Sequence, residues 1–242
     1  MKNVKFGLLG RNISYSFSKK YFTQKFKELN LPNYSYEIFD IDNINEIKRI
    51  IKDGDLLGLN VTIPYKEQVL PFLDIVSAEA KSIGAVNTIL IKNGQLKGFN
   101  TDVYGFEQTL FLHKKSYQKT AIVLGDGGAA KAVKFIFDKN KIPYTTISRK
   151  SEIDFENIDN QLVESSEIIV QCTPVGTFPN IEDSLVFPFE SLNERHLVID
   201  LIYNPERTRF MKNAQKQGAK CVNGYFMLEQ QAEKSWEIWN YS

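Results

Sequence analysis

The chain of 242 residues is long enough for one large domain or two modest ones, and its 43% hydrophobic and 24% charged residues are ordinary for a globular protein. A formal net charge of +1 gives no electrostatic reason to expect nucleic acid or an acidic membrane surface as a partner. Cys172 and Cys221 form neither a disulfide framework nor a metal-ligand pair, and no apolar run reaches the ~18 residues of a membrane span. We therefore expect a cytoplasmic protein without a bound metal.

The first hundred residues alternate short apolar runs with helical patterns. Strands are expected at Val4–Leu9, Tyr34–Phe39, Leu57–Val61, Val86–Ile91 and Gln95–Phe99, and helices at Tyr21–Leu29 and Ile44–Ile51. Asn93-Gly94 between the last two strands is the strongest short hairpin signal of the chain.

A different pattern begins near Asp102, where single strands alternate with helices. Helices are expected at Val103–Leu112, Ala129–Asp138, Arg207–Gln217 and Phe226–Trp239, and strands at Thr120–Leu124, Tyr144–Ile147, Glu167–Cys172, Leu197–Asp200 and Lys220–Val222. This alternation is typical of a doubly wound parallel sheet. The sequence thus predicts an α/β fold with two domains, divided near residue 101.

A glycine-rich loop follows the first strand of the second half. Gly125-Asp126-Gly127-Gly128-Ala129 separates an apolar strand from a helix. Glycines let the backbone approach a pyrophosphate, and the N–H groups of the helix's first turn then bind it. A plain tight turn is the alternative. Because a carboxylate repels phosphate, Asp126 must point to solvent or lie off the phosphate path.

The residues after the next strand bear on the choice of dinucleotide. An NAD site places an acid there, whereas this chain has Ser148-Arg149-Lys150, and arginine can bind a 2′-phosphate with two N–H groups. Two solvated surface bases are the alternative, and Glu152 leaves NAD as the lesser possibility. We predict NADP.

Hydride transfer to a ketone requires a proton donor next to the carbonyl. His113 and His196 lie in polar segments, which favours surface histidines, so the donor must be another residue. The best candidates are Lys66, at the end of a predicted strand, and Asp102, after the hairpin. Their alternatives are a surface lysine and a helix N-cap.

Six motifs in chain order make the sequence resemble the shikimate dehydrogenase family. They are Asn60-Val61-Thr62-Ile63-Pro64-Tyr65-Lys66, Gly84-Ala85-Val86-Asn87-Thr88, Asn100-Thr101-Asp102, Gly125-Asp126-Gly127-Gly128-Ala129, Asp200-Leu201-Ile202-Tyr203-Asn204-Pro205 and Met227-Leu228-Glu229-Gln230-Gln231-Ala232. The resemblance implies an oxidoreductase that reversibly reduces 3-dehydroshikimate to shikimate with NADPH, in aromatic amino-acid (chorismate) biosynthesis.

The resemblance also implies roles for single residues. Lys66 and Asp102 would be catalytic. Contacts to the substrate would come from Ser16, Ser18, Asn60, Thr62, Asn87, Tyr203 and Gln231. Contacts to NADP would come from Gly125, Gly127, Gly128, Ala129, Ser148, Arg149, Lys150, Thr173 and Gly224. The alternative for the serines is an N-cap of the helix expected at Tyr21–Leu29, a position that Ser18 could fill equally well.

The same resemblance implies a domain arrangement in which the last helix returns to the first domain. Residues 1–101 plus 225–242 would then form the substrate-binding and catalytic domain, and residues 102–224 the NADP-binding Rossmann domain. The expected partner is the small-molecule substrate, with the chain a monomer or a homodimer.

The chain also departs from the family pattern. Asn12, Tyr15 and Lys19 stand where a proline, a histidine and a second proline are usual, Asp126 replaces alanine, and Gln171 replaces asparagine. Three other interpretations stay open: an NAD-using quinate/shikimate dehydrogenase, a non-catalytic metabolite-binding homologue, and a methylene-tetrahydrofolate dehydrogenase. The last would need a larger apolar pocket than this polar set suggests.

Overall fold

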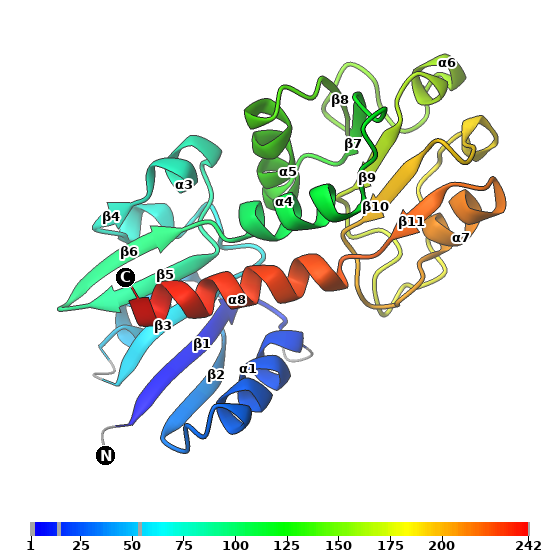
Figure 1. The fold of residues 1–242 in the computed structure, drawn as a ribbon. Coiled ribbons are helices and arrows are strands. Elements are labelled where there is room, and N and C mark those ends of the chain that lie inside the picture. The colour runs from blue at the N-terminus through cyan, green and yellow to red at the C-terminus, as the bar shows by residue number, and fades with distance from the viewer. Residues whose placement is uncertain (1–2, 14–15, 53–54, 242) are drawn as a thin grey trace. The chain divides into compact units, whose positions relative to one another are not determined.

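The structure is a computed structural model that describes residues 3–13, 16–52 and 55–241. Contacts between residues divide the chain into two compact units, one up to Thr101 together with the segment from Ala232, and the other Asp102–Gln231 (Figure 1). The domain boundaries predicted from the sequence, which assign 225–231 to the first domain, remain a prediction. Among the helices that are described, none is both long and apolar enough to cross a membrane.

The first unit is built on a mixed sheet with the strand order β2-β1-β3-β5-β6-β4. Its strands are β1 (Val4–Gly10), β2 (Tyr34–Asp40), β3 (Leu56–Val61), β4 (Ile75–Val76), β5 (Thr88–Lys92) and β6 (Gln95–Phe99). β1 pairs in parallel with β2 and β3, whereas β5 is antiparallel to both β3 and β6. Asn93 and Gly94 connect β5 and β6 with φ of 53° and 76°, which confirms the predicted hairpin.

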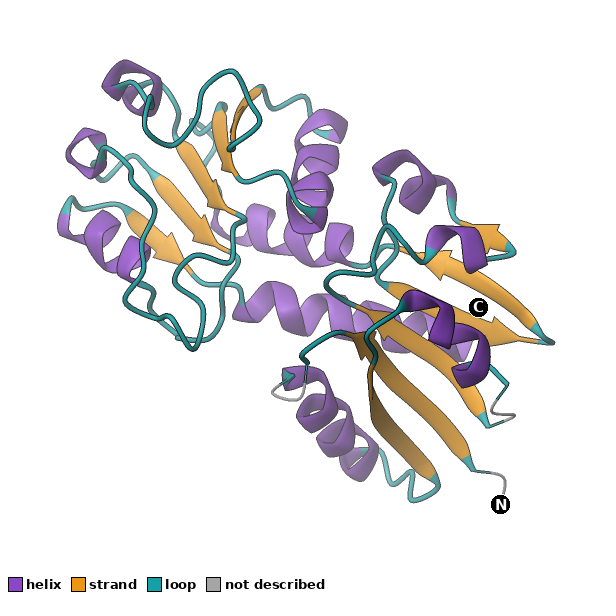
Figure 2. Ribbon diagram, turned by 180° about the vertical axis from the view of Figure 1, so that it is seen from behind, coloured by secondary structure: helices purple, strands orange, loops and turns teal. Residues whose placement is uncertain are grey.

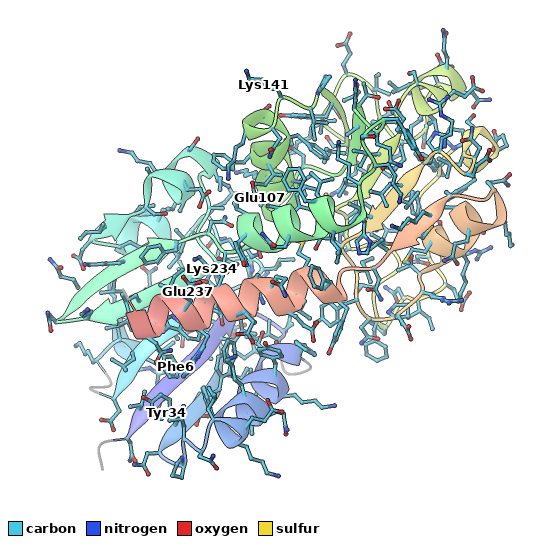
Figure 3. The ribbon with its side chains drawn as sticks, in the orientation of Figure 1. Phe6, Tyr34, Glu107, Lys141, Lys234 and Glu237 are labelled. Atoms are coloured by element: carbon cyan, nitrogen blue, oxygen red, sulfur yellow. The ribbon has the colours of Figure 1, made fainter. Side chains whose placement is uncertain are left out.

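Helices cover both faces of this sheet (Figure 2). An aromatic cluster on one face joins α1 (Phe17–Glu28) and the end of α8 (Tyr225–Tyr241) to β1 and β2, and includes Phe6 and Tyr34, whose ring centroids lie 5.9 Å apart (Figure 3). The opposite face is covered by η1 (Ile44–Glu46), α2 (Ile47–Ile50), η2 (Leu70–Phe72) and α3 (Ala78–Ile83).

The predicted return of the last helix to the first half of the chain is confirmed. The Trp239 ring stacks on Phe6 at 4.7 Å, and its Nε1 donates to the Ile89 carbonyl at 3.0 Å. A Cβ at Gly58 would lie 2.3 Å from the Trp239 Nε1, so a glycine in β3 makes room for this indole.

The second unit contains an all-parallel sheet with the order β11-β10-β9-β7-β8. Its strands are β7 (Ala121–Leu124), β8 (Tyr144–Ile147), β9 (Ile168–Gln171), β10 (Leu197–Asp200) and β11 (Lys220–Val222). Its helical segments are α4 (Asp102–His113), α5 (Gly128–Lys139), α6 (Asn160–Glu164), η3 (Phe189–Ser191), α7 (Arg209–Lys216) and the start of α8. Figure 2 shows helices on both sides of this sheet, which confirms the predicted doubly wound class.

The elements that the sequence did not predict are short. α3, α6 and β4 have 6, 5 and 2 residues, too few to display a hydrophobic period. The predicted strand from Val86 begins only at Thr88, because the backbone N–H groups of Val86 and Asn87 donate to Lys66 and Phe99 instead of to a regular ladder.

Candidate functional site

Lys66 ends a turn that is fixed at several points. Tyr65 is 2% exposed, and its hydroxyl donates to the Ile41 carbonyl at 2.7 Å, which anchors the turn in the core. The Lys66 carbonyl accepts from the Val86 N–H at 2.8 Å. The half-buried lysine side chain therefore starts from a rigid backbone at the carboxyl end of β3, as predicted.

Asn87 holds the chain that leads to Asp102. Its Oδ1 accepts from the Thr101 N–H at 2.7 Å and its Nδ2 donates to the Thr101 Oγ1 at 3.0 Å. Asp102 is the next residue, and α4 begins there with this carboxylate buried at 7% exposure. Asn87 follows Val86, which binds the Lys66 turn. Asn87 also fixes Thr101, the residue that precedes Asp102.

Ser16 and Ser18 lie at the start of α1. Ser16 is the N-cap and accepts from the Ser18 N–H at 3.2 Å, so the cap is Ser16 and not Ser18, which lies inside the helix. Both are half-buried, as is Thr62, and the Ser16 O–H can still donate to a carboxylate. Tyr15, one of the departures from the family pattern, lies outside the described residues.

The predicted cofactor residues gather at the carboxyl ends of three neighbouring strands. Gly125 follows β7, Ser148 follows β8 and Thr173 lies two residues after β9. The Gly125 N–H donates to the Ile147 carbonyl at 2.8 Å, and a Cβ at Gly125 would lie 3.0 Å from the Thr173 Cγ2. The chain changes direction across the sheet between β7 and β9, which is where doubly wound folds bind dinucleotides.

The glycine loop meets the structural requirements of a pyrophosphate site. Gly125 has φ of +109°, which other residues rarely adopt. Gly127 is the N-cap of the 12-residue helix α5 and has no side-chain cap, and apart from its chain neighbours no heavy atom of the described residues lies within 4 Å of a Cβ built there. Gly128 and Ala129 form the first turn, so their N–H groups point along the helix toward this open space.

Asp126 is half-exposed and forms an ion pair with Lys134 of α5. The predicted requirement that this carboxylate face solvent is met in part, and the lysine offsets its negative charge. A carboxylate is therefore compatible with a loop that binds phosphate, although the family pattern has alanine here.

The segment after β8 presents two cations. Arg149 and Lys150 are exposed, while Ser148 is 7% exposed and its Oγ accepts from the Lys150 N–H at 3.1 Å. Ser148 therefore shapes the turn, and the two basic side chains extend from it. This arrangement fits a 2′-phosphate better than a 2′-hydroxyl.

Gln171, another departure from the family pattern, shapes the loop that contains Thr173. Its Oε1 accepts from the Thr173 N–H, and its Nε2 donates to the Val175 carbonyl at 3.2 Å. The glutamine is fully buried, so the longer side chain fits by folding into its own loop.

Gly224 has a structural role that is independent of any cofactor. A Cβ at this position would lie 2.0 Å from the Leu201 carbonyl oxygen, and the Gly224 N–H donates to Ile202 at 3.0 Å. The backbone after β11 can pass the end of β10 this closely only with glycine. Its predicted contact to NADP stays a prediction.

Asp200 at the end of β10 is fully buried. Its Oδ2 accepts from the Thr208 hydroxyl at 2.6 Å and its Oδ1 from the Ile202 N–H at 3.0 Å. Burial nevertheless raises the pKa of this carboxyl to about 6, and the two hydrogen bonds oppose that rise only in part.

A raised pKa makes stability depend on pH with a definite sign. Folding favours the protonated form of Asp200, so its contribution is complete below about pH 4 and is lost as pH rises through about 6, in total about 3 kcal/mol. Asp200→Asn mimics the protonated acid. We expect its free energy of unfolding, relative to that of the wild type, to increase by about 1 kcal/mol or more as the pH rises from about 5 to about 8. Urea unfolding of both proteins measures this, and a difference that does not change with pH would contradict it.

Tyr203 and Gln231, the remaining predicted substrate ligands, belong to the second unit. Tyr203 is half-buried in the loop after β10, and the Gln231 Nε2 donates to the Leu228 carbonyl of its own helix at 2.8 Å. Their contact with the substrate remains a prediction.

The prediction that His196 lies on the surface is wrong. It is 1% exposed, its Nδ1 accepts from the Asn193 N–H at 3.0 Å, and its Nε2 lies 3.1 Å from the Val163 carbonyl. Charged neighbours at Glu194 and Arg195 concealed this in the sequence. Both ring nitrogens bind backbone groups, so His196 has a structural role.

Four buried polar residues in the first unit were not assigned to the site from the sequence: Tyr36, Thr88, Thr101 and Ser235. They form a hydrogen-bond network with Asn60 and Asn87. One signal was available, because Ser235 follows Gln231 by four residues and so lies on the same face of α8. A surface groove between α1 and β2 is lined by Lys19, Lys27 and Glu37, among others, and by none of the predicted substrate ligands.

Comparisons with known proteins show what the chain is similar to. Residues 8–89 match the family described as the shikimate dehydrogenase substrate binding domain. A shikimate dehydrogenase (NADP(+)) of Clostridium perfringens is 38% identical, over 97% of this chain and 92% of that protein. One of Clostridium beijerinckii is 36% identical, over 97% of this chain and 91% of that protein.

A solved structure resembles the whole chain. Shikimate 5-dehydrogenase from Thermus thermophilus, in complex with NADP(H) and shikimate, is 31% identical with a TM-score of 0.87, over 98% of this chain and 93% of that chain.

Proposed function

Because this chain belongs to the shikimate dehydrogenase family, we propose that it catalyses the reversible reduction of 3-dehydroshikimate to shikimate with NADPH, a step of aromatic amino-acid biosynthesis. The observation that carries the proposal is similarity over nearly the whole chain to relatives that use NADP. The glycine loop, at a helix N-terminus without a side-chain cap, supports the cofactor assignment.

Different residues of the chain have different roles in the proposed reaction. The bound cofactor supplies or accepts the hydride. Lys66 and Asp102 exchange a proton with the reacting oxygen, since a lysine paired with a carboxylate can both hydrogen-bond a hydroxyl and move its proton. Ser16 and Ser18 donate to the substrate carboxylate, while Asn60, Thr62 and Asn87 bind the ring hydroxyls. Tyr203 and Gln231 complete the substrate ligands.

Other residues are assigned to the parts of NADP. N–H groups of Gly127, Gly128 and Ala129 bind the pyrophosphate, with Gly125 and Thr173 lining the loop. Arg149 and Lys150, extended by the turn at Ser148, bind the 2′-phosphate. Gly224, which lets the chain pass the end of β10, would also contact NADP.

Steady-state kinetics of the purified protein test the proposal. Shikimate and quinate are each oxidised with NADP+ or NAD+, and formation of the reduced cofactor is followed by absorbance. We expect the highest kcat/KM for shikimate with NADP+. Preference for quinate or an equal rate with NAD+ would favour the quinate/shikimate rival. No oxidation of either substrate would favour a non-catalytic homologue.

Arg149→Ala is expected to lower the ratio of kcat/KM for NADP+ to that for NAD+ by about ten-fold or more, because a charged hydrogen-bond donor to the 2′-phosphate is lost. Activity with NAD+ should change by less than about three-fold, since its ribose lacks the phosphate. Arg195→Ala, at an exposed position of the same unit, is the matched control. An unchanged ratio would show that Arg149 is a solvated surface residue.

A further inference from the structure

The side-chain amide of Asn60 has nearly all of its hydrogen bonds inside the protein. Its Oδ1 accepts from the Tyr36 hydroxyl at 2.8 Å. Its Nδ2 donates to the Ser235 hydroxyl at 2.9 Å, with the Thr88 Oγ1 at 3.3 Å and the Asn87 carbonyl at 3.4 Å also in reach. An amide offers two N–H groups and two acceptor positions. Among the described residues, one donor reaches Oδ1, so one of its two acceptor positions has no partner there.

Ser235 is the centre of this network. It is fully buried, and its Oγ lies 2.8 Å from the Thr88 Oγ1 and 3.2 Å from the Thr101 Oγ1 in addition to the Asn60 amide. Thr101 accepts in turn from the Asn87 Nδ2. One hydroxyl of α8 therefore connects two predicted ligands of the ring hydroxyls, Asn60 and Asn87.

Tyr36 holds the other side of the amide. Its ring stacks on Phe22 at 4.7 Å with an interplanar angle of 9°, so the hydroxyl cannot move far. Burial raises the pKa of this phenol well above its ordinary value, and a hydrogen bond with Ser18 acts in the opposite direction. The stacked ring thus fixes the hydroxyl that donates to the Asn60 amide.

We propose that Tyr36 and Ser235 are positioning residues for substrate recognition, which hold the Asn60 amide with its oxygen as the acceptor for a substrate hydroxyl. Loss of either hydroxyl removes one of the hydrogen bonds that hold the amide in this orientation, so the preference for that orientation weakens. Asn60 then selects less strongly for a ring substituent that donates a hydrogen bond. This inference rests on the proposed function, because it concerns the same substrate.

Tyr36→Phe and Ser235→Ala each remove one hydroxyl. We expect each to raise KM for shikimate by on the order of ten-fold, with kcat changed by less than about three-fold and KM for NADP+ unchanged. The double variant should be less impaired than the product of the single effects, since both act through one amide. Thr88→Ser, which keeps the hydroxyl, should resemble the wild type, whereas Thr88→Val should raise KM.

Controls separate positioning from stability and from the proposed function itself. Phe26→Leu destabilises the same aromatic cluster without touching Asn60, so it should leave KM for shikimate unchanged. Calorimetric binding of shikimate is measured in parallel. If the wild type neither binds nor oxidises shikimate, the proposed function fails. If the wild type is active but Tyr36→Phe and Ser235→Ala keep its KM, or Phe26→Leu raises KM equally, the positioning roles are overturned.

Discussion

Replacing Lys66 by methionine is expected to lower kcat for shikimate oxidation by about 10²–10⁴-fold, the usual contribution of general acid–base catalysis. Methionine keeps the apolar stem of the side chain and removes the ammonium group. The backbone of the turn is held by Tyr65 and by the bond from Val86, so the fold should not change. The free energy of unfolding should therefore stay close to that of the wild type.

Asp102→Asn should lower kcat by a similar factor. The double variant should have a kcat only slightly below that of the less active single variant, since the effects of residues that act as a unit are not additive. Lys81→Ala, an exposed lysine on α3, is the control and should keep full activity. Losses that multiply in the double variant would contradict a shared proton-transfer role.

Gly224→Ala is expected to destabilise the protein by about 3 kcal/mol or more. The added Cβ would lie 2.0 Å from the Leu201 carbonyl oxygen, so the backbone at one of these two residues would have to move. The effect should be present without any ligand. Urea unfolding measures it, and a stability equal to that of the wild type would contradict the close approach.

Gly127→Ala is the matched comparison in the glycine loop. Apart from its chain neighbours, no heavy atom in the described part of the chain lies within 4 Å of the added Cβ, and φ is −84°, so stability should change by about 1 kcal/mol at most. KM for NADP+ should nevertheless rise about ten-fold or more, because the methyl group occupies the space that a pyrophosphate needs. An unchanged KM would mean that the loop is a plain turn.

Much of the fold could be predicted because local chemistry specifies it. The alternation of apolar strands and helices after Asp102 identified the parallel sheet, and Asn93-Gly94 identified the hairpin through the positive φ that both residues adopt. α3 and α6 escaped detection because one or two helical turns show no period. The prediction that His196 lies on the surface failed because it was based on the charged neighbours in the sequence. Those neighbours do not show that backbone groups bind both nitrogens of the ring.

The hydrogen-bond network around the predicted substrate ligands could not be predicted from the sequence. The motifs supplied Asn60 and Asn87, yet the hydroxyl that joins them comes from Ser235, 175 residues from Asn60. Tyr36 looked like an ordinary strand residue, because only its position opposite Phe22 and Asn60 gives its hydroxyl a role. Such contacts depend on which elements pack together, and no spacing along the chain encodes them.

In the proposed mechanism an ammonium and a carboxylate act on one substrate oxygen, and a crystal structure with shikimate and NADP+ is the sharpest test of it. We expect the Lys66 Nζ and an Asp102 oxygen both to lie within about 3.2 Å of the hydroxyl that is oxidised, next to the nicotinamide. A complex in which either group lies more than about 6 Å from that hydroxyl, with no bridging water, would rule this mechanism out.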